Sequence, residues 1–271
     1  MDLEWLGTSI KRNTTLKELN IANTGIDDES LIKFIRALEA NGALASVNIL
    51  CNFIGHAKSA KSVQALLKIK EETPSLTTLC GLRGDETELD LSCKCLTNGC
   101  TALLASEVNA NGALVRVDLS AKTPAYSKYA DPDFIRPIAN ALKANTTITE
   151  INLSKISLNA EAAKLLSDSI KNAKGTLAKL DISSTYNGGR HHESRGSEEF
   201  IRPIASMLKT NSSLMELNLS NNNLNMEATT IFADAMKDAN GALASLAFCG
   251  NGGFLGAEGD PVTMDITMTE A

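Results

Sequence analysis

The sequence has few aromatic residues, histidines or prolines, and it has no basic excess. Phenylalanine, tryptophan and tyrosine make up 4% of the 271 residues, with three histidines and six prolines. A core must therefore be built from Leu, Ile, Val and Ala, within an apolar content of 43% that is ordinary for a folded domain. The formal net charge of −6 argues against a nucleic-acid-binding face, which would need clustered basic residues.

Membrane and secretion signals are also lacking. No apolar run approaches the roughly 20 residues of a membrane-spanning helix. The segment Met1–Leu16 has neither the basic nor the apolar region of a signal peptide. The cysteines show no disulfide-framework spacing, and they are Cys51, Cys80, Cys93, Cys95, Cys100 and Cys249. We therefore expect a reduced, intracellular, cytoplasmic protein with no nucleic-acid or membrane partner.

One pattern recurs along the chain. Its clearest copy runs from Leu214 to Leu224 as L-x-x-L-x-L-x-x-N-x-L. Related segments begin at Leu16, Leu44, Leu76, Glu86, Leu114, Ile148, Leu177 and Leu243. Most successive copies are about 28 or 29 residues apart, which indicates a stacked array in which each unit buries its neighbours.

Each unit changes its apolar period from two to about 3.6. The alternating L-x-L-x-L part predicts a short strand with one buried face. The part that follows carries helical stripes, as in Leu31/Ile35/Leu38, Ile135/Ile138/Leu142, Ala163/Leu166/Ile170 and Ile201/Ile204/Leu208. Strand, crossover helix and parallel strand form a right-handed unit. The sequence thus predicts an α/β solenoid with a parallel sheet on its concave side and helices on its convex side.

The repeat resembles the leucine-rich repeat of the ribonuclease-inhibitor-like subfamily, which includes Ran GTPase activators, NOD-like receptors and tropomodulins. The resemblance covers about residues 3–255 and implies a right-handed horseshoe arc. Residues 10–44 are most similar to tropomodulin repeats, and the Asn-Gly-Ala-Leu turns look like those of protist and algal repeat arrays. We expect residues 1–255 to form a single domain of about eight or nine coils.

Both ends of the array need cover. The N-terminal helix, with Leu3, Trp5, Leu6 and Ile10, is expected to shield the first strand. At the other end, residues 256–271 are a tail or a cap. Val262–Met268 alternates like a strand and could fold back, and a disordered acidic tail is the alternative.

An asparagine recurs in the turn between a helix and the next strand, at Asn13, Asn41, Asn111, Asn145, Asn211 and Asn240. Asn tolerates the left-handed conformation that ends a helix, so we expect it to end these helices that way. This position also explains the three glycosylation sequons as turn chemistry, and they lie at Asn13, Asn145 and Asn211.

The ninth position of the repeat departs from the family, in which an Asn bonds to the backbone of the next coil. The occupants here are Thr24, Asn52, Gly84, Lys94, Lys122, Ile156, Thr185, Asn222 and Asn251. Because buried backbone groups need partners, we expect looser or distorted turns between about residues 82 and 190.

Three irregularities interrupt the array. Thr77–Leu82 and Glu88–Ser92 are too close for a helical crossover, so we expect a short helix-free repeat or, alternatively, a hairpin. Insertions at residues 121–132 and 185–196 both precede a Phe-Ile-Arg-Pro-Ile-Ala helix, so a block at about 114–176 is duplicated at 177–242. Inserted loops often mark a binding face. The candidate partner-binding residues of these loops are Tyr126, Tyr129, Tyr186, Arg190, His191, His192 and Arg195.

The pleat of the strands identifies a second candidate surface, on the concave face. The charged outward residues are Glu18, Glu88, Asp90, Arg116, Asp118, Glu150, Lys179, Asp181 and Glu216, and Thr78 with Cys80 occupies the equivalent positions in the third repeat. This surface is mildly acidic and free of aromatic residues. Short polar residues are also common on any solvated sheet, which is the plainer interpretation.

Signatures of chemistry are weak. His191, His192 and Glu193 lack zinc-ligand spacing. Cys93-x-Cys95-x4-Cys100 could hold zinc, but Cys93 matches Cys51 in the repeat, so we interpret it as a buried, core-flanking side chain. We find no phosphate-binding loop and no nucleophile–base arrangement, so we expect no enzyme activity, no cofactor and no metal.

The leading hypothesis is a monomeric, non-catalytic interaction scaffold. Its acidic concave face would steer a basic protein partner, and its tyrosine-bearing loops would anchor that partner. The resemblance implies two alternatives, a regulator that activates a small GTPase and an actin-filament end-binding protein of tropomodulin type. The N-terminal actin- and tropomyosin-binding region of the latter family is absent from this sequence.

Overall fold

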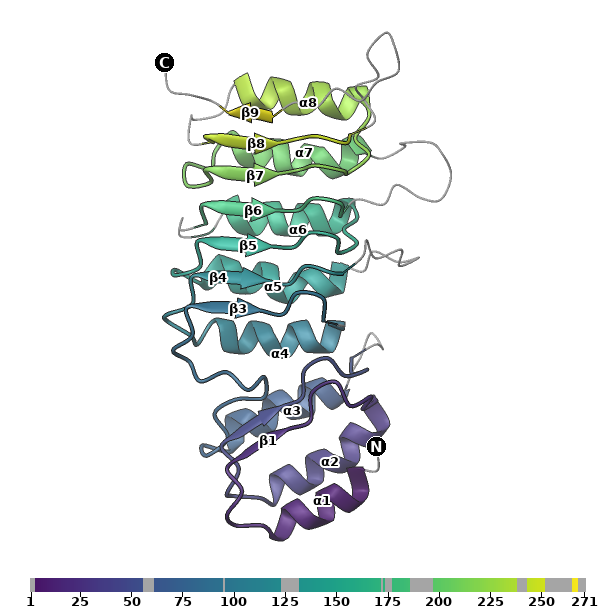
Figure 1. The fold of residues 1–271 in the computed structure, drawn as a ribbon, viewed down its shortest axis with the longest axis vertical. Coiled ribbons are helices and arrows are strands. Elements are labelled where there is room, and N and C mark those ends of the chain that lie inside the picture. The colour runs from purple at the N-terminus through teal and green to yellow at the C-terminus, as the bar shows by residue number, and fades with distance from the viewer. Residues whose placement is uncertain are drawn as a thin grey trace. The chain divides into compact units, whose positions relative to one another are not determined.

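Strands and helices alternate along the chain and occupy separate layers within each part of the molecule (Figure 1). The structure is a computed structural model that describes residues 3–55, 61–94, 96–122, 132–171, 173, 177–185, 197–237 and 243–251, and the backbone of 265–267. Two compact units are present, one formed by Met1–Glu86 with Cys95–Ala113 and the other by Thr87–Lys94 with Leu114–Ala271. The sequence predicts one array over 1–255, and the division falls at the short interval between the repeats that begin at Leu76 and Glu86.

The second unit is a sheet with helices on one side. Strands β3 to β8 are parallel and follow chain order, and helices α5 to α8 pack against one another in the same order. The bounds are β3 Glu88–Asp90, β4 Arg116–Asp118, α5 Pro132–Ala144, β5 Glu150–Asn152, α6 Ala160–Lys171, β6 Lys179–Asp181, α7 Ser197–Leu208, β7 Glu216–Asn218, α8 Met226–Lys237, β8 Ser245–Ala247 and β9 Asp265–Thr267. Strand β9 pairs antiparallel with β8, which corresponds to the folded-back alternative for this segment.

The first unit contains a two-stranded parallel sheet and four helices among its described residues. Its elements are α1 Leu3–Arg12, β1 Glu18–Asn20, α2 Asp28–Glu39, β2 Ser46–Asn48, α3 Lys61–Glu72 and α4 Asn98–Val108. Helix α1 packs on α2 through Leu3, Gly7 and Ile10. Trp5 was expected to belong to this apolar cover, but it is 73% exposed, because it lies on the face of α1 opposite the buried stripe.

The core lies between the strands and the helices in both units. The middle residue of each of the strands β1 to β8 is buried or half-buried, and in the second unit these residues are in register as Leu89, Val117, Ile151, Leu180, Leu217 and Leu246. All four helical stripes identified in the sequence are buried. The repeat register and the parallel pairing confirm the α/β solenoid of leucine-rich repeats as the fold class.

The turn asparagines act through their side chains. Oδ1 of Asn145 accepts hydrogen bonds from the backbone N–H groups of Thr147 and Ile148, both at 2.8 Å. Asn13, Asn41 and Asn211 accept the equivalent pair of bonds. None of these described asparagines has a positive φ, so the expected left-handed helix ends are wrong. Asn is required here as a short acceptor that stabilises the entry to the next strand.

The left-handed residue is found instead at the eighth position of the repeat. Asn23, Cys51, Cys93, Lys155, Ser184, Asn221 and Gly250 all have positive φ there. Backbone bonds between neighbouring coils continue at this position through the middle of the chain, from Cys93 N–H to Ser120 and from Lys155 N–H to Ser183, at 2.8 and 2.9 Å. The turns are therefore not distorted at the eighth position. There the backbone N–H of one coil donates directly to a backbone carbonyl of the next coil.

At the ninth position, asparagine is confined to the two ends of the array. Oδ1 of Asn52 accepts from the N–H groups of Thr24 and Ile26, and Asn251 bonds in the same way to the coil that contains Asn222. In the middle, Ile156 is buried and apolar, whereas Lys94 and Lys122 are exposed.

The sheet of the first unit ends at the segment Thr78–Cys80. Two N–H groups, on Val47 in β2 and on Ile49 just after it, donate to the carbonyl groups of Thr78 and Leu79. Its own N–H groups, on Leu79 and Cys80, donate to the carboxylate of Glu107 in α4. The segment does not pair with β3, so it is neither a hairpin arm nor a coil of a continuous sheet.

Glu107 is a buried carboxylate with a complete set of partners. Its side chain is 4% exposed and lies 2.9 Å from Nζ of Lys70, and it also accepts from the hydroxyl of Thr78 at 2.6 Å. A strand normally receives carbonyl groups from the next strand along the sheet. Here one side-chain carboxylate replaces them, and an orphaned buried N–H group would otherwise destabilise this edge.

Leu217→Ala should lower the free energy of unfolding by about 2–5 kcal/mol, because the side chain fills the space between strand and helix layers and is 2% exposed. Urea denaturation measures the change. The matched control is Met215→Ala, two residues earlier and 52% exposed, which should change stability by about 0.5 kcal/mol or less. Equal losses in the two variants would contradict the core assignment.

Glu107→Gln should destabilise the first unit by about 1–3 kcal/mol, because the neutral amide loses the charge that pairs with Lys70, and its nitrogen replaces one of the two oxygens that accept from Thr78 and Cys80. Hydrogen exchange should accelerate at the amides of Leu79 and Cys80. Glu72→Gln, in the exposed pair with Lys68 on α3, is the control and should leave both amides protected. Unchanged protection in Glu107→Gln would mean that the carboxylate does not terminate the sheet.

Candidate functional site

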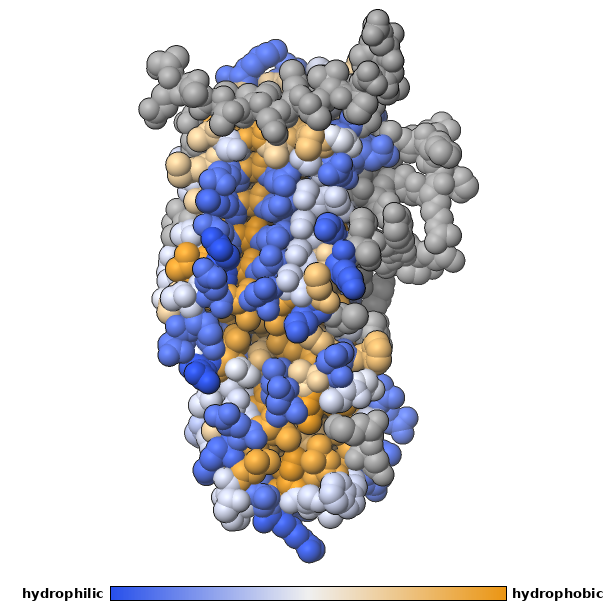
Figure 2. Space-filling view, in the orientation of Figure 1, coloured by the Kyte–Doolittle hydropathy of each residue, from blue (hydrophilic) through white to orange (hydrophobic). Residues whose placement is uncertain are grey.

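The outward residues of the second unit form two columns that cross the strands. The first column is Glu88, Arg116, Glu150, Lys179, Glu216 and Ser245, and the second is Asp90, Asp118, Asn152, Asp181, Asn218 and Ala247. Residues i and i+2 of a strand share a face, so both columns lie on the side of the sheet away from the helices. We call this surface the open sheet face. Figure 2 shows two hydrophilic columns separated by an apolar stripe on this face of the unit.

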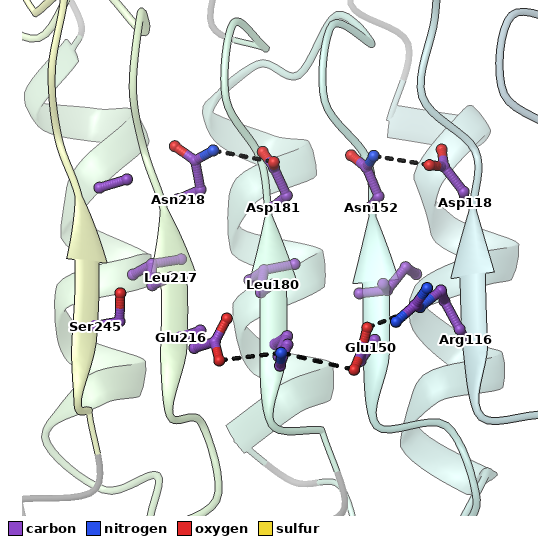
Figure 3. A pocket seen from close by; sticks show the side chains of 13 residues that line it. Arg116, Asp118, Glu150, Asn152, Leu180, Asp181, Glu216, Leu217, Asn218 and Ser245 are labelled. Atoms are coloured by element: carbon purple, nitrogen blue, oxygen red, sulfur yellow. Dashed lines mark hydrogen bonds and ion pairs between the residues drawn. The ribbon is translucent and has the colours of Figure 1, made fainter.

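Charges alternate along the first column and pair with their neighbours (Figure 3). Arg116 lies 2.8 Å from Glu150 and 3.8 Å from Glu88. Lys179 lies 3.1 Å from Glu216 and 3.8 Å from Glu150. The hydrogen bond from Lys179 to Glu216, together with the charges of Glu216 and Glu150, raises the pKa of Lys179. The basic side chains of Arg116 and Lys179 thus neutralise most of the negative charge that the glutamates bring to the first column.

The second column is held by hydrogen bonds between amides and carboxylates. Nδ2 of Asn152 donates to Asp118 at 2.9 Å, and Nδ2 of Asn218 donates to Asp181 at 3.0 Å (Figure 3). Among the described residues, no basic side chain lies within ion-pair distance of either aspartate. The unbalanced negative charge of the open sheet face therefore lies in this column.

Each acidic or amide side chain of the second column also shapes its own strand end. Oδ1 accepts the backbone N–H two residues later, as in Asp118 with Ser120 at 2.8 Å and Asp181 with Ser183 at 2.8 Å. Hydrogen bonding from the Ser92 side chain, and then from the Ser92 backbone N–H, lowers the pKa of Asp90. The short polar residues are therefore structural as well as exposed. A recurring Asp/Asn-x-Ser at the strand ends was the sequence signal for this role.

An open depression of about 450 Å³ lies over strands β4 to β8. Both columns line it, together with the central residues Ile151, Leu180 and Leu217. Charged walls flank a narrow apolar floor. This arrangement suits an extended contact with another macromolecule better than enclosure of a small ligand, because ligand pockets are concave and surround most of the ligand surface.

The structure brings together eight of the nine charged residues expected on the concave face. Glu88, Asp90, Arg116, Asp118, Glu150, Lys179, Asp181 and Glu216 share one sheet, together with Asn152 and Asn218, whose outward positions also follow from the strand pleat. Glu18 is exposed on the sheet of the first unit. Thr78 and Cys80 are buried rather than outward, since α4 covers the place of the next strand.

The inserted loops lie outside the described residues. This applies to Tyr126 and Tyr129 in the first loop and to Tyr186, Arg190, His191, His192 and Arg195 in the second. Their contribution to a partner surface stays a prediction.

The cysteines do not gather into a metal centre in the part of the chain that the structure describes, and no group of three or more ligand-type side chains is found there. Cys93 is exposed, so its expected core-flanking burial is wrong. Burial raises the pKa of the Cys80 thiol, which disfavours the thiolate that metal binding requires. None of the described helices is long and apolar enough to cross a membrane.

No protein-family model matches the chain. Two solved structures are similar to it at low identity. One is leiomodin-1 actin-binding site 2, with 22% identity and a TM-score of 0.44 over 58% of this chain and 82% of that one. The other is the Caenorhabditis elegans tropomodulin C-terminal domain, with 14% identity and a TM-score of 0.42 over 58% and 87% of the two chains. Likeness at this level assigns neither a family nor a function.

Glu216→Gln should lower the pKa of Lys179 toward its ordinary value, because the strongest contact that raises it is lost. A lysine pKa raised by folding stabilises the protein below the ordinary lysine pKa, and this contribution disappears as pH rises through the raised value. An NMR titration of the Lys179 side chain measures this pKa in the parent protein and in the variant. Glu227→Gln, whose partner is Arg202 on α7, is the control. A Lys179 pKa that stays the same in Glu216→Gln would contradict the ion pair between Lys179 and Glu216.

Proposed function

We propose that this protein is a non-catalytic, monomeric, cytoplasmic scaffold. It binds a basic protein partner through the open sheet face of the second unit and through the inserted loops at 121–132 and 185–196. The observation that carries the proposal is the organised surface itself, in which four carboxylates and two basic side chains, ordered in columns, line a depression of about 450 Å³.

The electrostatics of this face favour a basic partner. The positive side chains Arg116 and Lys179 are already paired, whereas the donors that the described residues offer to Asp118 and Asp181 are an amide and a backbone N–H each. Complementary charge raises the rate of association and selects against wrong partners more than it raises affinity. The tyrosines and arginines of the inserted loops are residue types enriched at interface hot spots, which supports the loops as anchors.

Affinity capture from extracts of the source cells tests the proposal with paired variants. Tyr126→Ala with Tyr186→Ala should reduce retention of the partner more than Glu18→Ala with Glu216→Ala, and both variants should keep wild-type unfolding curves. The control is Glu161→Ala with Glu227→Ala, two exposed glutamates on α6 and α8, the helix side of the unit. It should retain the partner fully.

Three outcomes are informative. Loss with the glutamate pair but not with the tyrosine pair would move the binding site to the sheet faces. An equal loss of partner retention in the helix-side control variant would contradict the proposal. A GTP-hydrolysis assay with a small GTPase and co-sedimentation with actin filaments separate the two alternatives, because a scaffold for another partner should be inactive in both.

A further inference from the structure

Strand β1 has an open edge. It pairs with β2 on one side, and among the described residues no strand pairs with its other side. Leu16 and Leu19 are half-buried, whereas the apolar residues equivalent to them in the later repeats are buried. Leu6 of α1 is also half-buried. The core of the first unit is therefore incompletely covered beside β1.

The backbone groups at this edge are oriented for pairing. The carbonyl group of Lys17 and the N–H group of Ile21 bond to β2 and to the residue that follows its repeat position, on one side of the strand. Alternate residues of a paired strand direct their backbone groups to opposite sides. The N–H and carbonyl groups of Glu18 and Asn20 therefore face the open edge.

The corresponding edge at β8 is covered by β9. Strand β9 runs antiparallel to β8, unlike the parallel strands β3 to β8, and its central residue Ile266 pairs with Leu246. It spans only Asp265–Thr267, and the connection from β8 is far longer than the roughly two to five residues of a tight hairpin. Each earlier strand of this sheet offers the same edge to a parallel neighbour. A covering segment keeps such an edge from pairing with another chain.

The β1 and β8 edges are complementary in the way that successive coils are. Helix α1 leads into β1 and packs on α2, as later crossover helices pack on one another, but no strand precedes α1 among the described residues. Strand β8 is followed by no helix in the described part of the chain. If β1 of a second molecule stacks on β8, its α1 takes the place of the next crossover helix, beside α8.

The hydrogen-bonding groups of the two edges match in register. Between β7 and β8, the N–H of Leu219 donates to the carbonyl of Ala247 at 2.8 Å. In the repeat, Phe248 occupies the position of Leu219, and Asn20 occupies the position of Ala247. The N–H of Phe248 can therefore donate to the carbonyl of Asn20 in a second molecule, which continues the parallel ladder.

Side chains at the two ends favour the same contact. The outward residues of β8, Ser245 and Ala247, are uncharged, so Glu18 of a second molecule would meet no like charge there. The end helices carry the two most exposed large apolar side chains among the described residues, Trp5 on α1 at 73% and Met226 on α8 at 71%. A contact that joins these helices can remove apolar surface from water on both.

We infer that this protein can assemble head to tail, with the β1 edge of one copy paired in parallel with the β8 edge of the next, and that β9 blocks this assembly by occupying β8. The partner is a second copy of the chain. A contact between two different surfaces of one chain gives a ring or an open series of oligomers rather than a symmetric dimer. The inference does not depend on the proposed function, because it concerns the strand edges and not the open sheet face or the loops.

The first test releases β9 in the full chain. Ile266→Pro removes the N–H of the central residue of β9, and proline is poorly tolerated in a paired strand. Sedimentation velocity and light scattering measure the mass over a range of concentrations. The variant should form a series of oligomers that raises the average mass to more than twice the 28.8 kDa of the monomer. The wild-type chain and the control Ile266→Val should stay monomeric.

The second test checks the register in the Ile266→Pro background. Ser245→Lys places a cation between Glu216 of its own sheet and Glu18 of the next copy, which continues the alternation of the first column. It should tighten association about twofold to fivefold, as expected of an exposed ion pair. Adding Glu18→Lys should remove this gain, because two cations would then be adjacent. Adding Glu72→Lys instead, the same charge change on α3, should preserve the gain.

Urea unfolding confirms that each variant is folded. If proline unfolds the last coil, glycine at positions 265, 266 and 267 releases β9 instead, because glycine disfavours strands, and the same measurements apply. Folded variants that stay monomeric at every concentration would overturn the inference. An assembly that stops at a dimer, or that does not respond to the charges at 245 and 18, would also overturn it, because another surface would then be responsible.

Discussion

A strand of three residues cannot satisfy its own backbone, so each coil of this protein depends on hydrogen bonds from its neighbour. Where a neighbour follows in register, the parallel ladder supplies them. Where it does not, another group must. The Thr78–Cys80 segment meets this requirement with the carboxylate of Glu107, and the division of the chain into two compact units coincides with that substitution. At β8 the same requirement is met by an antiparallel strand.

Much of this fold could be read from apolar periodicity. The alternation of the strands and the 3.6-residue stripes of the helices depend on burial, which is a local property of each unit, and the structure confirms them. The end of the first sheet could not be read in this way. Glu107 lies in α4, about 28 residues along the chain from the amides that it satisfies, and the apolar periodicity of the repeat does not predict those contacts.

Misassigned side chains have a common cause. Cys93, Thr78 and Cys80 were placed by repeat register, which gives the position of a residue in an ideal coil. Register fails where a coil lacks a neighbour or where the backbone turns left-handed. The candidate site was more predictable, since eight of its charged residues follow from strand pleat alone. The hydrogen bonds from Asn152 and Asn218 were not, because they depend on how adjacent side chains orient across the sheet.

The alternating first column also constrains how such a chain can lengthen during evolution. Copying a single coil would place like charges on adjacent strands, Glu beside Glu or a cation beside a cation, and such pairs are destabilising when directly opposite. Copying two coils keeps every neighbour oppositely charged, as Arg116, Glu150, Lys179 and Glu216 are. The smallest duplication that lengthens this sheet without placing like charges on adjacent strands is therefore a pair of coils, not a single coil.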